Sequence, residues 1–416
     1  MEDVICEILS VGTELLMGQI ANTDAQYLSR KLSQMGITVY RHSVVGDNPD
    51  RLREAVKTAL SRCDLLITSG GLGPTEDDIT KEIVCEVMGF PLALHEESKE
   101  AIEAFFARVG REMTPNNLRQ AMQPVGGIVM RNRKGTAPGC IVEKDGKIAA
   151  VLPGPPRELS GMFEDQLEPY LLQKTGLTFF SEYLRIVGVG ESKVEAVLED
   201  LFHSADPTLA LYCAPGEVQA RITAACRRGE DGSQKTAPVK KEIYRRLGNS
   251  VYAEGEDASM AATLLDMMRS RGMKLALAES CTGGLLASKL VALSGASDVL
   301  LASLVTYANS AKEALLGVPS TILNTCGAVS SECALAMARG AREKTGADCA
   351  ISVTGIAGPG GGTPEKPVGT VYVGLSGPFG DKWERLSLTG DRTHIREVTC
   401  LYAMNLMRLA ILSPDQ

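Results

Sequence analysis

The 416-residue sequence contains few of the side chains that most often build metal sites and hydrolytic triads. It has four histidines and one tryptophan, and aromatic residues make up only 5% of the chain. Metal sites and catalytic triads that depend on histidine are therefore not expected. The 11 cysteines are odd in number and scattered, and no Cys-x-x-Cys pair occurs. We expect neither a zinc site nor a disulfide framework, and a cytoplasmic location.

Long apolar runs and basic runs are also missing. No stretch holds about 18 uninterrupted apolar residues, so no membrane span is expected. The start of the chain, MEDVICEILSVGTELL, is acidic and lacks a signal-peptide pattern. The net charge of −8 and the absence of any basic run longer than a pair argue against direct nucleic-acid binding. What remains is the composition of a soluble globular protein with about two to three domains.

The first third of the chain alternates between strand and helix patterns. Strands are predicted over residues 4–12, 37–46 and 64–73, and helices over 22–36, 48–63 and 77–89. Repeated units of this kind predict a parallel sheet with helices on both faces, and such sheets bind ligands at the carboxyl ends of their strands. Glycine-rich and acidic segments fall at these ends: residues 12–14, 46–48 and 70–78.

The rest of the chain divides into two further regions. Residues 177–254 combine short strands and helices into a small α+β module, and strand–helix alternation resumes after residue 256. The predicted fold class is therefore α/β, with two α/β domains of parallel or mixed sheet joined by an α+β module. The predicted boundaries are 1–173, 174–255 and 256–416.

The loop SGGLGPTEDDIT is the first candidate ligand site. Gly70, Gly71 and Gly73 leave backbone amides accessible, and amides around glycines form anion-binding concavities. Asp77 and Asp78 can hold Mg²⁺ against a phosphate. They can equally serve only to cap the helix that follows. Glu14 and Asp47 lie at the ends of other predicted strands and favour the ligand-binding interpretation.

The segments GTELLMGQIANTDAQYLS, VGDN, TSGGLGPTEDDIT and LPGPPRE closely resemble the N-terminal domain of the CinA family. That domain is similar to molybdopterin-binding domains. The resemblance implies a phosphate-bearing ligand and, in some members, ADP-ribose pyrophosphatase activity with a divalent metal, for which Mg²⁺ is expected. It assigns ligand contacts to Glu14, Gly70, Gly71, Gly73, Asn116 and Arg119, adds Glu158, and assigns metal contacts to Asp47, Asp77 and Asp78.

The middle module is expected to be KH-like by the same resemblance. KH domains clamp RNA with a GXXG loop. The segment GVGES at residues 188–192 is not that motif, and Glu191 would repel phosphate. We expect a structural or linking role.

The segment LALAESCTGGLLASKLV, residues 275–291, is the second candidate site. A buried strand ends in three potential nucleophiles, Ser280, Cys281 and Thr282, and a helix pattern follows. Taken alone, this is more often a capped helix than a site. Amides at the start of that helix can bind a phosphate or an oxyanion. Lys312 follows the next strand and, if desolvated, can act as a base.

Four segments in this order, AESCTGG, TYANSAK, TGIAGPGGG and GDR, closely resemble the C-terminal CinA domain, which also occurs alone as the PncC-type amidohydrolase. The resemblance implies hydrolysis of nicotinamide mononucleotide to nicotinic acid mononucleotide and ammonia, without a cofactor. It assigns Ser280 as nucleophile, Lys312 as base and Tyr307 as an assisting residue. Further ligand contacts are implied at Thr282, Gly283, Gly284, Asn309, Thr354, Gly355 and Arg392. Cys281 has no partner and is expected to pack. One departure is visible, because Ala302 and Ser303 stand where glycines are expected.

Two other interpretations stay open. The N-terminal domain can be a binding module for a molybdopterin-like ligand, or the protein can act through partners in DNA uptake or damage response. By resemblance we expect small nucleotides as ligands and a homodimer.

Overall fold

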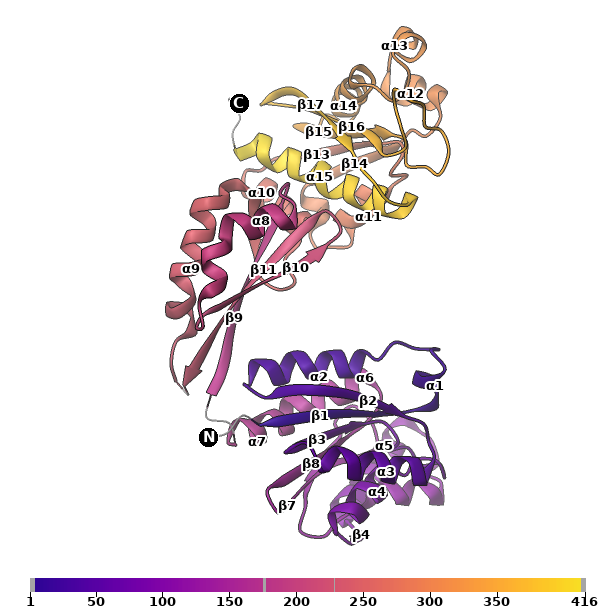
Figure 1. Ribbon diagram of the computed structural model, residues 1–416. Coiled ribbons are helices and arrows are strands. Elements are labelled where there is room, and N and C mark those ends of the chain that lie inside the picture. Colours follow the sequence, from indigo (N-terminus) through magenta and orange to yellow (C-terminus); the bar gives the residue numbers. More distant parts are fainter. Residues whose placement is uncertain (1–3, 175–176, 228, 413–416) are drawn as a thin grey trace. The chain divides into compact units, whose positions relative to one another are not determined.

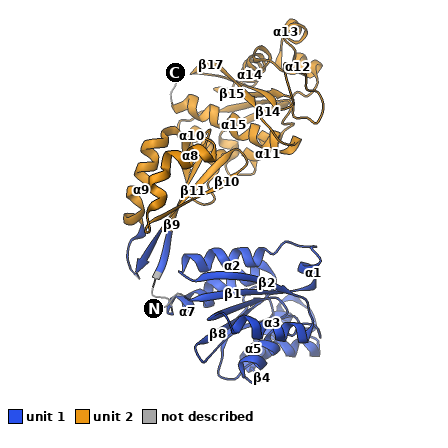
Figure 2. Ribbon diagram, in the orientation of Figure 1, with its two compact units in different colours: residues 1–180, 224–232 blue, residues 181–223, 233–416 orange. Residues whose placement is uncertain are grey.

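The computed structural model describes residues 4–174, 177–227 and 229–412. The described residues form two compact units (Figure 2). Unit 1 contains those up to residue 180 together with residues 224–232. Unit 2 contains residues 181–223 together with those after 232.

The N-terminal sheet of unit 1 has six strands in the order β2-β1-β3-β8-β7-β6 (Figure 1). The strands are β1 (Ile5–Val11), β2 (Thr38–Val45), β3 (Leu65–Ser69), β6 (Ile128–Met130), β7 (Gly139–Lys144) and β8 (Lys147–Leu152). The first four strands in this order run parallel to one another. Strand β7 pairs with β8 in the antiparallel direction, and β6 pairs with β7 in the antiparallel direction. The β7–β8 hairpin turns at Asp145 and Gly146, where both residues have positive φ, as the Asp-Gly pair predicts.

Helices cover both faces of this sheet. Ile8 and Ile67 pack in a cluster with α2 and α6, and Leu9 and Leu66 pack in another with α3 and α4. Alternating side chains of the central strands are thus buried on opposite sides, which explains their nearly continuous apolar sequence. The helices of this domain are α1 (Thr13–Leu16), α2 (Thr23–Gln34), α3 (Pro49–Leu60), α4 (Thr80–Met88), α5 (Glu96–Val109), α6 (Pro156–Met162) and α7 (Glu168–Leu172).

Several elements were not predicted from the sequence. They are the 14-residue helix α5, a two-stranded sheet of β4 (Leu92–Leu94) and β5 (Met122–Pro124), the 3₁₀ helix η1 (Pro115–Ala121), and the π-helical turn η2 (Phe163–Leu167) between α6 and α7. Of these, η1 contacts the glycine-rich loop that follows β3, through Arg119 and Gln120.

The middle module has a four-stranded sheet in the order β10-β11-β9-β12. Its elements are β9 (Leu177–Val187), α8 (Glu191–Leu198), η3 (Glu199–His203), β10 (Thr208–Ala214), β11 (Glu217–Arg227), α9 (Gly232–Leu247), η4 (Gly248–Ser250) and β12 (Val251–Glu254). Alternate residues of β11 are buried, and Val218, Ala220 and Ile222 pack with Val194 of α8 and Ile243 of α9. This is the small α+β module that the sequence predicts.

The C-terminal sheet has five strands in the order β14-β13-β15-β16-β17, of which the first three are parallel. The elements are α10 (Met260–Ser270), β13 (Leu275–Glu279), α11 (Leu285–Val291), η5 (Ala296–Asp298), β14 (Leu300–Val305), α12 (Asn309–Leu316), α13 (Ser320–Thr325), α14 (Ser331–Thr345), β15 (Cys349–Gly355), β16 (Thr370–Gly377), β17 (Gly380–Ser387) and α15 (Arg392–Leu412). Helices α10, α11 and α15 bury one face, and α12 to α14 bury the other. The predicted fold class, two α/β domains with a KH-like module, is confirmed.

Candidate functional sites

Ser280 and Lys312 meet at the carboxyl end of the parallel part of the C-terminal sheet. Ser280 directly follows β13, and Lys312 lies on α12, which follows the neighbouring strand β14. Lys312 Nζ is 3.0 Å from Ser280 Oγ, although 32 residues separate the two in sequence. The side chains are 8% and 1% exposed, respectively. The strand order thus places a potential nucleophile against a buried amine.

The surroundings of Lys312 favour its neutral form. Burial lowers the pKa of Lys312 from its ordinary value. No carboxylate pairs with it within the described residues. Nζ instead contacts the carbonyl oxygens of Thr306, at 2.7 Å, and Tyr307, at 3.4 Å. A neutral amine has two N–H bonds for these carbonyls and one lone pair, which is left for the Ser280 hydroxyl.

Glu279, the last residue of β13, occupies the N-terminal end of α11. Its fully buried carboxylate accepts hydrogen bonds from the amides of Gly284, Leu286 and Ala287 at 2.9–3.1 Å. The expectation that Gly284 and the following helix-terminal amides stay open for a phosphate or an oxyanion is therefore wrong. The free amides of a helix start attract a carboxylate, and here the protein supplies its own.

Ser303 explains a departure from the expected glycine pattern. Its hydroxyl donates to Glu279 Oε1 at 3.2 Å. The residue that stands in place of a glycine thus adds a fourth hydrogen bond to the buried carboxylate.

The backbone after Ser280 keeps two open donors. Within the described residues, the amides of Cys281 and Thr282 have no oxygen acceptor, whereas the amide of Gly283 donates to the Ser280 carbonyl. The Thr282 hydroxyl is also buried and has no partner in that part of the chain. Cys281 lies in the hydrophobic core, and burial raises the pKa of its thiol to about 12. Cys281 is thus far less suited than Ser280 to act as a nucleophile.

Three other predicted residues of this site, Tyr307, Arg392 and Thr354, form hydrogen bonds within the protein. Tyr307 is 64% exposed, and its hydroxyl accepts a hydrogen bond from Arg392 Nη2 at 3.2 Å rather than contacting Ser280. Arg392 also donates to the Gly358 carbonyl in the glycine-rich loop after β15. Thr354 donates to the Ala328 carbonyl at 2.7 Å, so its hydroxyl proton is already used within the fold.

Gly355 and Asn309 are two further predicted ligand contacts, and the structure shows different surroundings for each. A Cβ on Gly355 would lie 2.8 Å from the Cα of Val371, so strand packing alone requires glycine there. Asn309, the first residue of α12, is exposed. Arg396 was missed by the sequence analysis, because its contact with the Thr282 carbonyl joins residues 114 positions apart.

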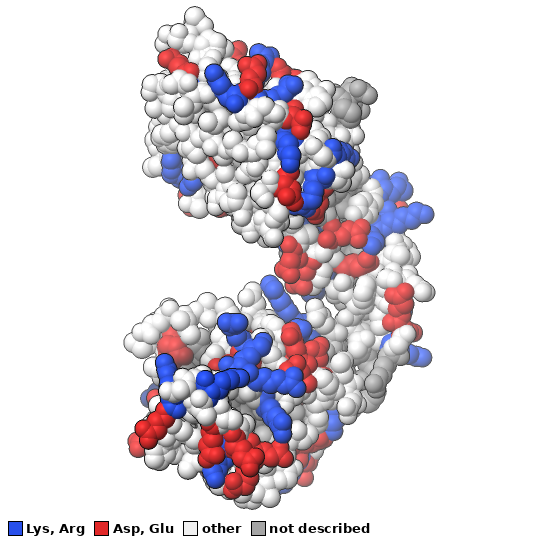
Figure 3. All heavy atoms as spheres, turned by 180° about the vertical axis from the view of Figure 1, so that it is seen from behind, with Lys and Arg blue, Asp and Glu red and all other residues white. Residues whose placement is uncertain are grey.

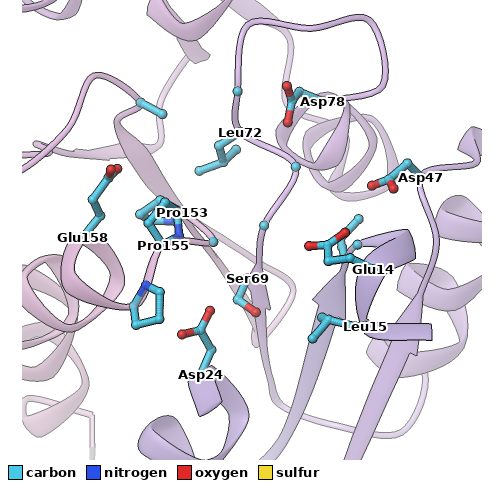
Figure 4. Close-up of a pocket in the computed structure, with 18 of the residues that line it drawn as sticks. Glu14, Leu15, Asp24, Asp47, Ser69, Leu72, Asp78, Pro153, Pro155 and Glu158 are labelled. Carbon is cyan, nitrogen blue, oxygen red and sulfur yellow. The ribbon is translucent and has the colours of Figure 1, made fainter. Parts of the chain in front are cut away.

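The N-terminal domain has a cavity of about 650 Å³ at the carboxyl ends of its parallel strands (Figure 4). The predicted residues that line it are Glu14, Asp47, Gly70, Gly71, Gly73, Asp77, Asp78 and Glu158. Within the described residues, the amides of Gly71, Leu72 and Gly73 have no acceptor. Gly70 and Gly71 both have positive φ, which favours glycine at these positions. The loop therefore offers three amides to an anion.

Asn116 and Arg119 are not among the residues that line this cavity, and their role as ligand contacts stays a prediction. Asn116 donates to the Pro74 carbonyl at 3.2 Å, and Arg119 Nη1 donates to the Thr75 carbonyl at 2.9 Å. Both come from η1 and brace the outside of the glycine-rich loop.

Two of the predicted metal-binding carboxylates are already engaged in hydrogen bonds. Asp47 Oδ2 accepts from the amide and hydroxyl of Thr13 at 3.0 and 2.7 Å, and Asp78 Oδ2 accepts from the amide and hydroxyl of Thr75. Among residues 4–174, 177–227 and 229–412, no group of three or more His, Cys, Asp or Glu side chains can hold a metal ion. The carboxylates fit Mg²⁺ only where phosphate oxygens of a ligand complete its coordination.

Two polar residues of the cavity were missed by the sequence analysis. Gln120 donates to the Leu72 carbonyl at 3.1 Å, while its Oε1 is buried without a partner in the described part of the chain. Asp24, at the start of α2, points into the cavity beside Pro155 and Ser69 (Figure 4). Asp24 lies 13 residues beyond the end of β1 and has no distinguishing local pattern, and the loop that contains Pro155, beside which it lies, is far away in sequence.

Comparisons with known proteins cover nearly the whole chain. Residues 7–173 match the family described as probable molybdopterin binding domain, residues 181–253 the damage-inducible protein CinA KH domain, and residues 257–411 the CinA C-terminal domain. The chain is 48% identical over 403 residues to a putative competence-damage inducible protein from Acetivibrio thermocellus, covering 97% of both chains. It is 47% identical to a CinA-like protein from Dictyoglomus turgidum, covering 98% of this chain and 99% of that one.

Among solved structures, a competence/damage inducible protein from Agrobacterium tumefaciens is similar to part of the chain. The identity is 41%, the TM-score is 0.36, and the match covers 37% of this chain and 93% of that one. The full-length sequence relatives decide the matter: the chain belongs to the CinA family.

Proposed function

We propose that the protein hydrolyses the carboxamide of nicotinamide mononucleotide at Ser280 and binds and hydrolyses ADP-ribose at the N-terminal cavity. One observation supports the proposed amidase activity most strongly. The Lys312 amine is buried, no carboxylate pairs with it in the described part of the chain, and it lies 3.0 Å from the Ser280 hydroxyl. A serine becomes a nucleophile at neutral pH only beside a base, and a desolvated lysine is such a base.

The proposed reaction proceeds through an acyl-enzyme. Ser280 Oγ attacks the carboxamide carbon while Lys312 Nζ accepts the hydroxyl proton. The tetrahedral intermediate then collapses, and Lys312 returns the proton to the departing nitrogen, which leaves as ammonia. Water attacks the ester, Lys312 accepts a proton from that water, and the proton returns to Ser280 as the carboxylic acid product is released. The product ionises in solution.

The oxyanion donors in this proposal are the amides of Cys281 and Thr282. They immediately follow the nucleophile, and neither has an oxygen acceptor among the described residues. The α11 amides contribute indirectly, because their bonds to Glu279 fix the turn that carries Ser280. Removing one oxyanion donor typically costs about 10²–10³ in rate.

The second activity rests on the shape and chemistry of the N-terminal cavity. Open amides of the Gly71–Gly73 loop face a space whose volume is typical of small-molecule sites. Asp47 and Asp78 are the residues that would share a Mg²⁺ with the ligand phosphates. The ion, when bound, neutralises phosphate charge. Within this domain the chain itself supplies the anion-binding amides and the carboxylates that orient the loop.

The test of the amidase compares ammonia release from nicotinamide mononucleotide by the wild type, Ser280→Ala and Cys281→Ala. Loss of activity in Ser280→Ala, with activity retained in Cys281→Ala, is the expected result. Cys281 is the matched control, because it is the neighbouring buried nucleophile. Ammonia release at the wild-type rate by Ser280→Ala would remove the proposal.

A second candidate function is a non-catalytic binding module for a pterin phosphate in the N-terminal domain. Its support is the family match over residues 7–173. Titration with ADP-ribose and with a pterin phosphate, with and without Mg²⁺, separates the two. A third, a role in competence through DNA contact, has less support, because the net charge of the chain is −8 and acidic side chains lie beside the basic ones on the face shown in Figure 3. Steeply salt-dependent DNA binding would be needed to support it.

A further inference from the structure

The N-terminal cavity has a carboxyl group that neither the glycine loop nor the acidic cluster explains. Asp24 lies in the first turn of α2, where Asn22, not Asp24, accepts the hydrogen bond from the Ala25 amide. Its Oδ1 is buried and has no hydrogen-bond partner in the described part of the chain. A buried carboxyl oxygen without a partner is costly, so its retention at a cavity wall needs an explanation.

Asp24 belongs to a part of the cavity with different chemistry from the anion-binding loop. Figure 4 shows the rings of Pro153 and Pro155 on this side of the cavity, and Ile20 and Ala21 also belong to the cavity lining. Figure 4 shows Asp24 apart from Asp47 and Asp78, on the side of Pro155 and Ser69. One space thus combines an amide-rich loop for phosphates with an apolar wall and a single carboxyl group, which suits a flat heteroaromatic ring.

We infer that Asp24 in its neutral form reads the adenine of ADP-ribose, accepting a hydrogen bond from the exocyclic amine and donating one to ring nitrogen N1. This inference rests on the proposed ADP-ribose site. A protonated carboxyl group is both donor and acceptor, and this pattern complements the Watson–Crick edge of adenine. An ionised carboxylate only accepts, so it complements rings with two adjacent donors, such as guanine.

The protonation of Asp24 is within reach of ordinary conditions. Burial raises the pKa of its carboxyl group to about 6. The other ionisable groups that face the cavity are Glu14, Asp47, Asp77, Asp78 and Glu158. On the elements packed against α2, Glu7 of β1 is bonded to Arg62, His42 of β2 to Ser29, and Glu164 of η2 to Lys31. Burial, and not a charged neighbour, is the cause of the shift.

This assignment predicts that adenine binding takes up a proton. With a pKa near 6, about half of the free protein is competent at pH 6 and about 1% at pH 8, so the affinity for ADP-ribose falls up to about 50-fold between them. The diester pyrophosphate of ADP-ribose stays ionised across this range and contributes no such change. The carboxamide introduced by Asp24→Asn would carry the same donor and acceptor at every pH.

The experiment is calorimetric titration of the full chain with ADP-ribose, in EDTA so that no metal-dependent turnover occurs, at pH 6 and pH 8. The variants are Asp24→Asn and, as a matched exposed carboxylate in the same domain, Asp50→Asn. We expect the affinity of the wild type and of Asp50→Asn to fall toward pH 8, and binding to take up about half a proton at pH 6 and about one proton at pH 8. We expect Asp24→Asn to bind equally at both pH values and more tightly than the wild type at pH 8.

Guanosine diphosphate ribose separates ring recognition from a general effect of pH. Its ring offers two donors, so its affinity for the wild type should not fall toward pH 8. Equal weakening of both ligands, or pH-independent binding of ADP-ribose by the wild type, overturns the role of Asp24 and leaves the ADP-ribose site standing. Absence of ADP-ribose binding at either pH removes the site itself and the inference with it.

Discussion

The two sites lie at the same position in similar sheets, at the carboxyl ends of the parallel strands, but they differ in whether the backbone amides there are already hydrogen-bonded. In the N-terminal domain the amides of Gly71, Leu72 and Gly73 stay open beside a wide cavity. In the C-terminal domain Glu279 accepts hydrogen bonds from the amides at the start of α11, and within the described residues the amides of Cys281 and Thr282 have no oxygen acceptor. Open amides suit the binding of phosphates, whereas filled amides hold a nucleophile in a fixed geometry.

The two sites also differ in the burial and the hydrogen-bond partners of their ionisable groups. Lys312 is buried, no carboxylate pairs with it in the part of the chain that the structure describes, and burial lowers its pKa. Asp47 and Asp78 sit at the cavity and bond to nearby threonines. The proposed functions account for this difference, with proton transfer in the C-terminal domain and recognition of charge in the N-terminal domain. The predictions below test this contrast, beginning with the largest effect.

Ser280→Ala should abolish deamidation and leave ADP-ribose binding unchanged. Loss of the nucleophile removes the acyl-enzyme route, so the rate of ammonia release should fall by at least about 10³-fold. The measurement is ammonia release, with calorimetric binding of ADP-ribose as the control. A parallel loss of ADP-ribose binding would mean that the two sites are not independent.

Lys312→Arg should lower deamidation nearly as much, because arginine stays protonated and cannot accept the Ser280 proton. In the wild type, burial disfavours the charged amine, so the pKa of Lys312 lies below its ordinary value of 10.5. The fraction of neutral base grows as pH rises toward that pKa, and kcat/KM should rise with it and then level off. A rate that falls as pH increases from 7 to 9 would contradict this role.

Glu279→Gln tests whether the filled helix start matters for chemistry. The amide group has one accepting oxygen where the carboxylate had two, and its NH₂ would face backbone donors. We expect kcat to fall about 10²-fold through displacement of Ser280, with a smaller change in KM, and the domain to lose about 1–3 kcal/mol of stability. Ser303→Ala is the milder control, because it removes one of the same four bonds. An unchanged kcat in a destabilised Glu279→Gln protein would assign Glu279 to folding alone.

Asp78→Ala should weaken ADP-ribose binding by about tenfold and spare the amidase. Asp78 holds the amide and hydroxyl of Thr75, and its loss frees the glycine-rich loop to move. Calorimetry with ADP-ribose measures the effect, and ammonia release is the control. Replacing Asp50, an exposed residue of α3, with alanine should change neither ADP-ribose binding nor ammonia release.

Tyr307→Phe should have the smallest effect, at most about fivefold in kcat/KM. The hydroxyl is exposed and bonds Arg392, not the Ser280–Lys312 pair. The measurement is the kcat/KM of deamidation. A loss as large as that of Lys312→Arg would show that the phenol takes part in proton transfer.

The sequence could predict the parts of this molecule that depend on local pattern. Alternating strand and helix signals predicted the sheets, and the rule for carboxyl ends of parallel strands predicted that Ser280 and Gly71 lie at ligand-facing positions. The 3.0 Å contact between Ser280 and Lys312 follows once β13 and β14 are neighbours. Strand order is a tertiary property that local pattern does not predict, and it was the family resemblance that implied the Ser280–Lys312 pair.

Other parts could not be predicted, because they depend on which groups compete for one partner. The motif AESCTGG contains both an acid and open amides, and nothing local shows that Glu279 reaches forward to α11. The hydrogen bonds that join Asn116 and Arg119 to the glycine-rich loop connect residues 42 and 44 positions apart, so no local pattern predicts them. Asp24 has no distinguishing local pattern, because its burial depends on the loop around Pro155.

The most direct test of the two-site account is a single preparation assayed in parallel for nicotinamide mononucleotide deamidation and ADP-ribose hydrolysis, using Ser280→Ala and Asp78→Ala. The account predicts a reciprocal result, in which Ser280→Ala loses only deamidation and Asp78→Ala is impaired only with ADP-ribose. Loss of both activities in either variant, or of neither in Ser280→Ala, would contradict it.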